Sequence, residues 1–442
     1  MSSLIKVNTG NLVVGMYISE LDRPWLDTPF LIQGFYVKNQ DDIDIISGIC
    51  DYVFVDSAVS RQKITSKMDT VSSAIGIDPG RTEFTVTKIN TKQSKPGANR
   101  GATKSTQRNN KLNDLFPDKK LTQYADTATW QDETPAAKQA ISTLHTCLND
   151  LLTRNRNDGP LEIAKIKQSV EPMIDSVTRN PDACIWLARM KQEDNYIYEH
   201  SLGASIWAVA LGRQLGLPKA DLHSLAIGGL LFDVGKLRLN KDLLKAKRRL
   251  TSKELIIMKR HVEIGVKLLK EGGLMNQDVI DMVSHHHERH NGSGYPQGLV
   301  GDQIPVFARI AAIVDVYDAI TSDRIYAKAI APSLAIKQLY DWKDIYFQGE
   351  LVEEFIQAIG IYPAGTLIEL SSGEVAVVVA ETSSRRLRPQ VILLLDRDKQ
   401  PLDGIDFIDL LEVTQTEDGR PLDIVKSLQP NAYGIDMSAI EL

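Results

Sequence analysis

Residues 285–296 read HHHERHNGSGYP, and no other stretch says as much about this chain. Four of the 8 histidines in the whole chain fall within it. Neutral imidazole is the commonest protein ligand for transition metals, so the run indicates a metal site. Gly292 and Gly294 permit a sharp turn beside a bound group, and Pro296 stiffens the exit from that turn. The alternative is a polar surface loop in which histidines happen to cluster.

Three further fragments and one histidine supply the context for this stretch. Leu230–Lys236 reads LLFDVGK, Lys259–Gly265 reads KRHVEIG and Ile313–Ala319 reads IVDVYDA, while His200 opens an apolar helical run. In this order the fragments resemble the HD-GYP family, a branch of the HD superfamily of metal-dependent phosphohydrolases. The resemblance runs from about Ala136 to Gly360. It implies a mainly helical fold with an HD-type core, and hydrolysis of the bacterial second messenger cyclic di-GMP.

The resemblance implies two transition-metal ions held by histidine and aspartate. The expected ligands are His200, Asp233, His261, His286, His287 and Asp315. Asp233 would bridge the two ions, the next three histidines would bind one of them, and His200 with Asp315 would serve the other. Mixed nitrogen and oxygen ligands suit iron or manganese, with zinc or nickel as alternatives. Two such ions lower the pKa of a bridging water and neutralise phosphate oxygens, which helps to cleave a phosphodiester.

The resemblance also implies which residues meet the substrate. The expected catalytic residues are Asp233, Lys236 and Asp318, and the expected substrate-binding residues are Lys236, Tyr295 and Arg324. Lys236 would contact phosphate or assist at the reacting centre. Asp318 lies three residues after Asp315, on the same helix face, where it could orient a water or accept a proton. Arg324 suits a bidentate grip on phosphate or on a guanine edge.

Two positions depart from the family pattern. Phe232 stands where the family has the histidine that precedes Asp233, and phenylalanine cannot donate to a metal. Losing even a residue that supports a metal ligand typically costs 10–100-fold in affinity or activity, so the loss of a direct ligand should cost more. Tyr196 stands where some members carry a glutamate for a third metal. The sequence therefore implies two metal ions at most.

Two functions remain open on these residues. The first is a cyclic di-GMP phosphodiesterase that yields linear pGpG and GMP, supported by the surviving ligands. The second is a degenerate HD-GYP signalling module that binds cyclic di-GMP or a partner protein without hydrolysis, supported by Phe232. In the family, the loop formed by Gly292, Gly294, Tyr295 and Pro296 can dock onto diguanylate cyclase domains. Such domains are therefore an expected partner of this chain.

Bulk properties favour a location in the cytoplasm. A net charge of -6 gives no overall bias toward nucleic acid, which is not expected as a partner. Cys50, Cys147 and Cys184 are scattered and odd in number, which argues against a disulfide framework. The N-terminus lacks the pattern of a signal peptide, and no apolar run is long enough to cross a bilayer.

The first third of the chain predicts a small domain and a linker. Residues 1–66 alternate short apolar runs with turn residues, which predicts a small α/β domain with a helix over 41–50 and a strand over 52–56. Whether this domain senses a signal or sets a homodimer is left open by the sequence. Residues 67–135 include a stretch rich in Lys, Asn, Thr, Ser and Gln, which predicts a flexible linker.

The rest of the chain changes from helical to strand periodicity. Apolar residues at helical spacing predict the HD-GYP domain over 136–360, including one helix over 252–271. Short apolar runs separated by turns predict a small β module over 361–412. Residues 413–442 are expected to form a tail without a readable role.

Overall fold

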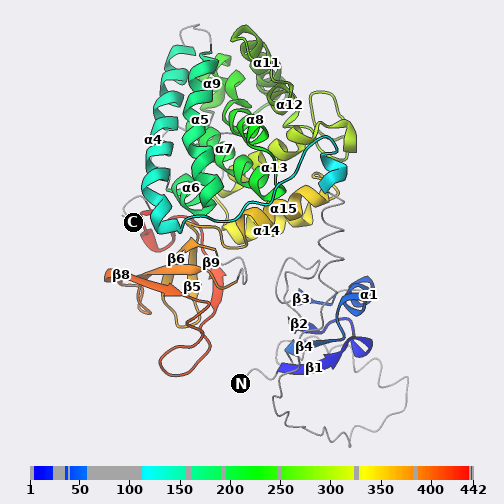
Figure 1. Cartoon of the computed structure of the whole chain (residues 1–442), viewed down its shortest axis with the longest axis vertical. Coiled ribbons are helices and arrows are strands. Elements are labelled where there is room, and N and C mark those ends of the chain that lie inside the picture. The colour runs from blue at the N-terminus through cyan, green and yellow to red at the C-terminus, as the bar shows by residue number, and fades with distance from the viewer. Residues whose placement is uncertain are drawn as a thin grey trace, which may run out of the picture. The chain divides into compact units, whose positions relative to one another are not determined.

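The structure is a computed structural model, and it divides the chain into two compact units, Met1–Asn110 and Lys111–Leu442 (Figure 1). The described residues are 4–22, 35–37, 40–56, 112–155, 161–190, 196–246, 248, 250–322, 328–381, 387–437 and 440. All structural statements below concern those residues, and each unit is described by itself. Within them, no helix is both long and apolar enough to cross a membrane.

The N-terminal unit is a small antiparallel sheet with one helix, as the sequence predicts. Its elements are β1 (Leu4–Asn8), β2 (Tyr17–Leu21), β3 (Phe35–Tyr36), α1 (Gln40–Ile49) and β4 (Tyr52–Asp56). The sheet order is β1-β4-β2-β3, and each pair is antiparallel. Ile18, Ile46 and Val53 are fully buried, so the apolar faces of the strands and of α1 form one core.

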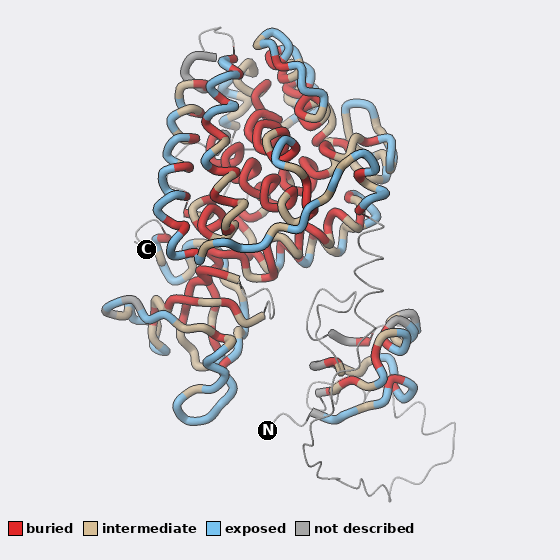
Figure 2. Tube along the Cα trace, in the orientation of Figure 1, coloured by how far each residue is buried: buried red, intermediate tan, exposed pale blue. Residues whose placement is uncertain are grey.

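The second unit is built around a helical core, which confirms the predicted fold class. Its helices are α4 (Trp130–Asn155), α5 (Ile163–Arg179), α6 (Pro181–Arg189), α7 (Tyr196–Leu215), α8 (Lys219–Leu231), α9 (Lys241–Leu244), α10 (Ser252–Lys259), α11 (His261–Glu271), α12 (Gln277–His285), α13 (Val306–Thr321), α14 (Pro332–Asp341) and α15 (Gly349–Ile359). Helices α7, α8 and α13 are apolar on nearly all sides and lie at the centre, where buried residues gather (Figure 2). Helices of that kind must be covered by others.

The predicted helix over 252–271 is wrong in one respect, because it is two helices. Helix α10 ends at Lys259, Arg260 lies between the helices, and α11 begins at His261. The periodicity did not reveal the break because Arg260 keeps a right-handed helical φ/ψ of -66° and -14°. The break makes His261 the first residue of a new helix.

The polar segment before α4 belongs to the helical unit in its described part. Leu112 and Phe116 are buried, the Thr122 amide donates to the Gly216 carbonyl at 2.7 Å, and Lys119 pairs with Asp221 at 2.8 Å. The predicted end of the linker, residue 135, is therefore too late. Its polar composition concealed the few apolar residues that anchor it.

A five-stranded antiparallel sheet follows the helices. Its strands are β5 (Leu367–Leu370), β6 (Val375–Ala380), β7 (Gln390–Leu395), β8 (Pro401–Asp409) and β9 (Ile424–Ser427), in the order β8-β7-β6-β5-β9. Strand β9 lies beyond residue 412 and pairs with β5, so part of the predicted tail completes the sheet. Its short sequence, IVKS, mixes apolar and polar residues and carries little strand signal.

Candidate metal centre

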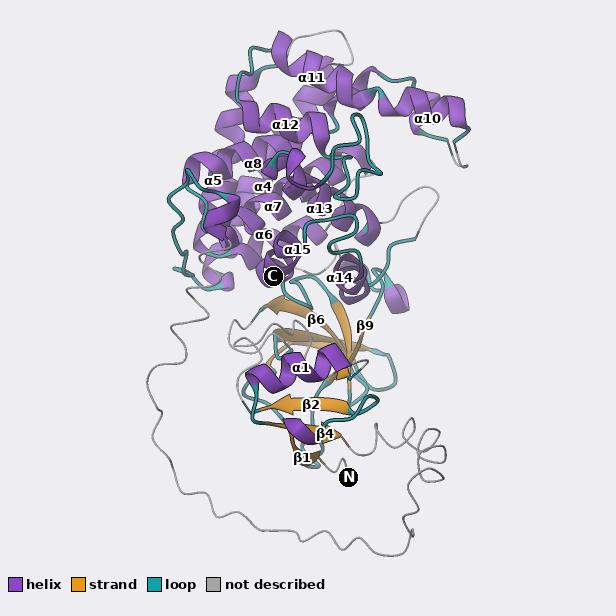
Figure 3. Ribbon diagram, turned by 90° about the vertical axis from the view of Figure 1, so that its right-hand side faces the viewer, coloured by secondary structure: helices purple, strands orange, loops and turns teal. Residues whose placement is uncertain are grey.

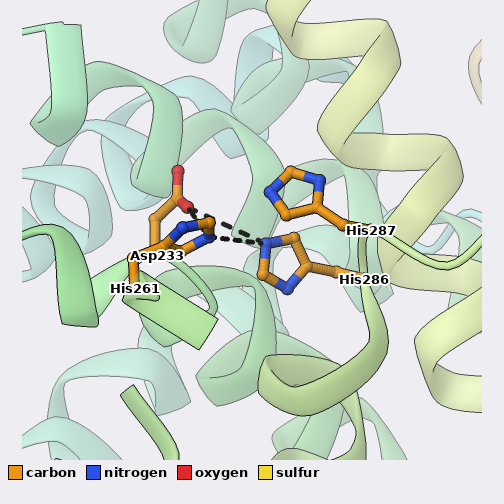
Figure 4. A group of neighbouring side chains, drawn as sticks. All are labelled: Asp233, His261, His286 and His287. Carbon is orange, nitrogen blue, oxygen red and sulfur yellow. Dashed lines mark hydrogen bonds and ion pairs between the residues drawn. The ribbon is translucent and has the colours of Figure 1, made fainter. Parts of the chain in front are cut away.

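Four side chains suited to metal binding converge from separate segments of the helical unit (Figure 4). Asp233 lies between α8 and the 3-10 turn η3 (Val234–Arg238), His261 begins α11, and His286 and His287 directly follow α12. Each offers one ligand atom, and these atoms all lie within 4.8 Å of one another. We call His261, His286 and His287 the imidazole half of the site.

Gly235 allows the backbone carrying Asp233 to approach the start of α11. A Cβ atom at Gly235 would lie 1.9 Å from the carbonyl oxygen of His261, a distance at which any side chain would force the segments apart. The Oδ1 atom of Asp233 lies 3.3 Å from Nε2 of His261 and 3.8 Å from Nε2 of His286. The glycine after Asp233 thus sets the spacing between the carboxylate and the imidazoles.

Hydrogen bonds to the backbone fix which ring nitrogen of two histidines faces the centre. Nδ1 of His261 lies 2.7 Å from the Met258 carbonyl oxygen, and Nδ1 of His286 lies 3.1 Å from that of Val283. A carbonyl oxygen only accepts, so each Nδ1 carries the hydrogen. In the neutral rings Nε2 then presents a lone pair, and the two Nε2 atoms lie 3.4 Å apart. Such fixation of the ring by its second nitrogen is typical of metal-binding histidines.

Burial keeps the imidazole half neutral. It lowers the pKa of His286 to about 4, lowers that of His261, and lowers that of His287 well below its ordinary value. At neutral pH the three rings therefore retain lone pairs for a cation. Burial pushes the pKa of Asp233 upward, but Lys236 and the surrounding histidines outweigh it and hold that pKa well below its ordinary value. The Lys236 Nζ donates to Asp233 Oδ2 at 2.5 Å.

A second group, His200, Asp315 and Asp318, adjoins the first, and we call it the carboxylate half. Nε2 of His200 lies 3.1 Å from Asp315 Oδ1, and its Nδ1 lies 2.9 Å from Asp318 Oδ2. Burial lowers the pKa of His200, but the two carboxylates outweigh it and raise that pKa to about 9. Asp233 Oδ2 is 3.7 Å from His200, and His287 Nδ1 is 3.7 Å from Asp315, so the halves are continuous.

Asp318 lies on the far side of His200 from Asp233. Its Oδ1 accepts a hydrogen bond from the Trp207 Nε1 at 3.1 Å, its Oδ2 contacts His200, and the residue is 1% exposed. A carboxylate with both oxygens engaged in this way is poorly placed to receive a proton from water. These contacts suit a residue that positions His200, and the catalytic role of Asp318 stays a prediction.

Phe232 forms an apolar wall between the two halves. Its ring is fully buried, stacks on His286 with centroids 4.9 Å apart, and meets His200 edge-on at 5.4 Å. The side chain thus lies between two histidines of the site and offers no donor atom itself. It leaves the remaining nitrogen and oxygen donors at the centre but adds none.

The loop after the histidines is held by a buried carboxylate. Glu288 is 1% exposed and accepts the amides of Gln297 at 2.7 Å and Leu299 at 3.1 Å. A Cβ atom at Gly294 would lie 2.4 Å from the Arg289 amide nitrogen and from the Glu288 Cα, so only glycine allows the loop to fold back this closely. The Tyr295–Pro296 peptide bond is cis. The contacts of Glu288 and the close approach at Gly294 thus hold the loop beside the imidazole half.

Tyr295 covers the imidazole half from this loop. Its ring stacks on His287 with centroids 4.6 Å apart and 27° between the planes, and the Lys259 ammonium lies 4.5 Å from its ring centroid. Lysine over an aromatic face is a favourable cation–π arrangement. The order Lys259, Tyr295, His287 leads from the exposed end of α10 to the centre.

Not every residue named from the sequence is described. Arg324 lies outside the described residues, and the side chain of Tyr196 is not described either. In contrast, sequence reasoning missed the roles of Trp207, Glu288 and Lys259. Glu288 and Lys259 left a signal, because they fall inside the quoted stretches 285–296 and 259–265. Trp207 contacts Asp318 across 111 positions of sequence, a separation that local patterns do not reveal.

Comparison with known proteins agrees with this geometry. Residues 173–351 match the HD domain family, and residues 4–166 match a domain of unknown function, DUF3391. A cyclic di-GMP phosphodiesterase of Pseudomonas aeruginosa is 36% identical over 258 residues, which cover 58% of this chain and 62% of that protein. Residues 173–351 are therefore an HD domain, similar to those of cyclic di-GMP phosphodiesterases of the HD-GYP type. The clustered histidines and Asp233 lie within this domain.

Two more relatives widen the comparison. A cyclic di-GMP phosphodiesterase response regulator of Xanthomonas campestris is 36% identical over 148 residues, covering 33% of this chain and 39% of the relative. A 3'3'-cGAMP-specific phosphodiesterase of Vibrio cholerae is 31% identical over 159 residues, covering 36% and 30%. The chain thus spans less than two thirds of the length of each of the three relatives.

Proposed function

We propose that this protein is a metal-dependent phosphodiesterase that hydrolyses cyclic di-GMP to pGpG and GMP. The observation that carries the proposal is the imidazole half, where buried neutral histidines meet Asp233 with ligand atoms within 4.8 Å of one another. The names of two relatives, both cyclic di-GMP phosphodiesterases, supply the substrate class. The relative named for 3'3'-cGAMP makes a mixed cyclic dinucleotide the first alternative substrate.

The donor set fits a transition-metal ion. Asp233 Oδ1 is buried and has no hydrogen-bond partner among the described residues, although three imidazoles surround it, which is the arrangement expected of a ligand atom. The imidazole half with Asp233 would hold one ion, and His200 and Asp315 together with Asp233 would hold a second. Iron or manganese suits these donors best, with zinc or nickel as alternatives. When bound, such ions activate water and neutralise phosphate oxygens.

The remaining residues then have distinct tasks. Lys236, already at Asp233, places a positive charge where a phosphate oxygen would lie. Asp318 holds His200 through Nδ1, so that its Nε2 faces Asp315. Tyr295 presents an aromatic ring beside His287 for contact with a base or ribose of the substrate. Arg324 is assigned to the substrate by resemblance alone.

A second candidate function is favoured by one observation, the buried Phe232 ring against both His200 and His286. If the missing ligand prevents turnover, the protein binds a cyclic dinucleotide without cleaving it and signals through a partner. The loop over Gly292–Pro296 is the candidate surface, since Ser293 and Pro296 are exposed. A diguanylate cyclase domain is the partner that the family resemblance suggests. The two candidates differ in turnover and not in ligand binding.

Turnover by the purified full chain tests the proposal. The protein is loaded with Fe(II) or Mn(II) under reducing anaerobic conditions, and product formation from cyclic di-GMP and from 3'3'-cGAMP is followed chromatographically. The matched control is the double variant His286→Ala/His287→Ala, which lacks two of the expected ligands. Turnover above that control supports the phosphodiesterase. Tight dinucleotide binding with no turnover above the control supports the second candidate instead.

A further inference from the structure

The segment over 236–260 carries a charge opposite to that of the chain. It holds ten Lys and Arg residues against two acidic residues, Asp242 and Glu254, a net of +8 in a chain whose total is -6. Lys241, Lys245, Lys253, Lys259 and Arg260 are exposed. Among the described residues, none of these five has an acidic partner within ion-pair distance. In the same segment, Lys236 pairs with Asp233 and Arg248 pairs with Glu254.

Helix α10, within this segment, exposes its apolar residues. Leu255 is 46% exposed, Ile256 65% and Ile257 45%, and no residue of the helix is buried. The next helix, α11, buries Val262, Leu268 and Leu269 in the core. The apolar residues of α10 therefore do not serve the core of the protein. Figure 3 shows α10 at the outer edge of the helical unit.

Helix α10 is nevertheless a well-formed element. Thr251 and Glu254 form a reciprocal capping box at its N-terminus, and Arg248 makes two hydrogen bonds to Glu254 at 2.8 and 2.7 Å. These contacts stabilise the helix without covering its aliphatic side chains. The exposed aliphatic residues are thus held in place on a basic surface.

We propose that this basic aliphatic face, formed by Lys241, Lys245, Lys253, Lys259 and Arg260 with the aliphatic residues 255–257, docks the protein on an anionic lipid membrane. Leu255, Ile256 and Ile257 are consecutive, so they point to different sides of α10 and do not form an amphipathic stripe. Exposed aliphatic side chains among lysine and arginine can still attach a surface to anionic lipid, because burial of apolar area adds to electrostatic attraction. Each basic residue near an anionic surface strengthens binding by about fivefold, so several together suffice for a reversible attachment. The inference goes beyond the proposed phosphodiesterase function and does not depend on it.

Other occupants of the face fit the observations less well. Nucleic acid is disfavoured because no Phe, Tyr or Trp occurs over 236–260, and bases are held largely by aromatic stacking. A second copy of the chain is disfavoured because a two-fold pair would oppose the same positive face to itself. The dinucleotide substrate would use the charge but gives no reason for exposing Leu255, Ile256 and Ile257. An anionic lipid surface accounts for both the positive charge and the exposed aliphatic side chains.

The docked face adjoins the candidate metal centre. Lys259 ends α10 above the Tyr295 ring, and that ring stacks on His287. A membrane held against α10 would therefore lie beside the outer rim of the imidazole half. The attachment would place the site at the surface of the membrane without any membrane-spanning helix.

Co-sedimentation of the full chain with vesicles tests the inference. We expect binding to phosphatidylglycerol-containing vesicles, weak or no binding to pure phosphatidylcholine vesicles, and a loss of binding as salt rises. The double variant Lys245→Glu/Lys253→Glu should weaken binding by about tenfold or more, and Ile256→Gln by several-fold. The variant His286→Ala/His287→Ala should bind vesicles normally, which separates this inference from the proposed function.

Matched controls come from other exposed helices. Lys167→Glu/Lys337→Glu changes two exposed lysines of α5 and α14, and Leu334→Gln changes an exposed leucine of α14. Neither should alter vesicle binding. The inference is overturned if the wild type does not bind anionic vesicles, or if the controls weaken binding as much as the α10 variants. It is also overturned if the Lys245 and Lys253 changes reduce dinucleotide binding but leave vesicle binding intact.

Discussion

The two halves of the candidate metal centre satisfy their polar groups in different ways. In the imidazole half, His261 and His286 use one nitrogen on a backbone carbonyl and keep the other toward Asp233. In the carboxylate half, both nitrogens of His200 contact carboxylates. Burial keeps the first half neutral, whereas Asp315 and Asp318 favour a charged His200. The imidazole half therefore offers lone pairs to a cation. In the carboxylate half, His200 carries a proton that a bound cation would replace.

Removing the imidazole half should have the largest effect. His286→Ala/His287→Ala deletes two of the four grouped donors, and we expect metal content to fall and turnover to drop by more than about 100-fold, since even support residues of a metal cost 10–100-fold. Metal is measured by elemental analysis of the purified protein. His285→Ala is the matched control, because His285 is adjacent but outside the group. If His285→Ala lost as much metal and turnover, the effect would not be specific to the imidazole half.

The carboxylate half should depend on the group behind it. Asp318→Asn keeps the shape but removes the charge that holds Nδ1 of His200, and we expect turnover to fall by about 10–100-fold with the fold intact. Trp207→Phe removes only one donor to the same carboxylate and should cost less. Metal stoichiometry distinguishes the halves, because the imidazole half should keep its ion in both variants. Loss of all metal from Asp318→Asn would show that the halves do not act separately.

Changes in the loop beside the imidazole half should lower the stability of the protein. Glu288→Ala leaves the amides of Gln297 and Leu299 without their acceptor, which should lower the free energy of unfolding by about 2 kcal/mol. Urea denaturation measures the change. Glu263→Ala, at an exposed position of α11, is the control and should change the same quantity by less than about 0.5 kcal/mol. A loop that tolerates Glu288→Ala would not be held in the way described.

The smallest effect on catalysis is expected from Lys259, which contacts the imidazole half only through Tyr295. Lys259→Ala removes the cation over Tyr295, an exposed contact worth about 0.5–1 kcal/mol, so KM should rise by about two- to fivefold with kcat little changed. Lys253→Ala, in the same helix, should leave KM unchanged in a vesicle-free assay. A large fall in kcat for Lys259→Ala would instead place this lysine among the reacting groups.

Much of the fold could be predicted because long periodic segments are strong signals. The central helix α13 reads as a nearly continuous apolar run, and the sheet strands β5 to β7 are short apolar runs between turns. The errors lie where the local signal is weak. Arg260 continues the helical pattern across the break, β9 has mixed polarity, and two buried residues, Leu112 and Phe116, anchor a segment that is otherwise polar.

The candidate site was predictable in its residue types and not in its internal contacts. The decisive stretch and its companion fragments supplied the histidines and aspartates through family resemblance. Which nitrogen of each ring faces Asp233, and which group holds His200, depends on residues far apart in sequence. Asp318 shows the limit most clearly, because its spacing from Asp315 suggested catalysis while Trp207 and His200 engage its oxygens.

Phe232 provides the most direct test of the account, because its ring touches both halves. The measurement is the rate of cyclic di-GMP hydrolysis by the wild type and by Phe232→His, each loaded with Fe(II) or Mn(II) and assayed for metal content. The account predicts turnover by the wild type, which Phe232→His increases but does not create. Turnover by Phe232→His alone would contradict it and leave a protein that binds the dinucleotide without cleaving it.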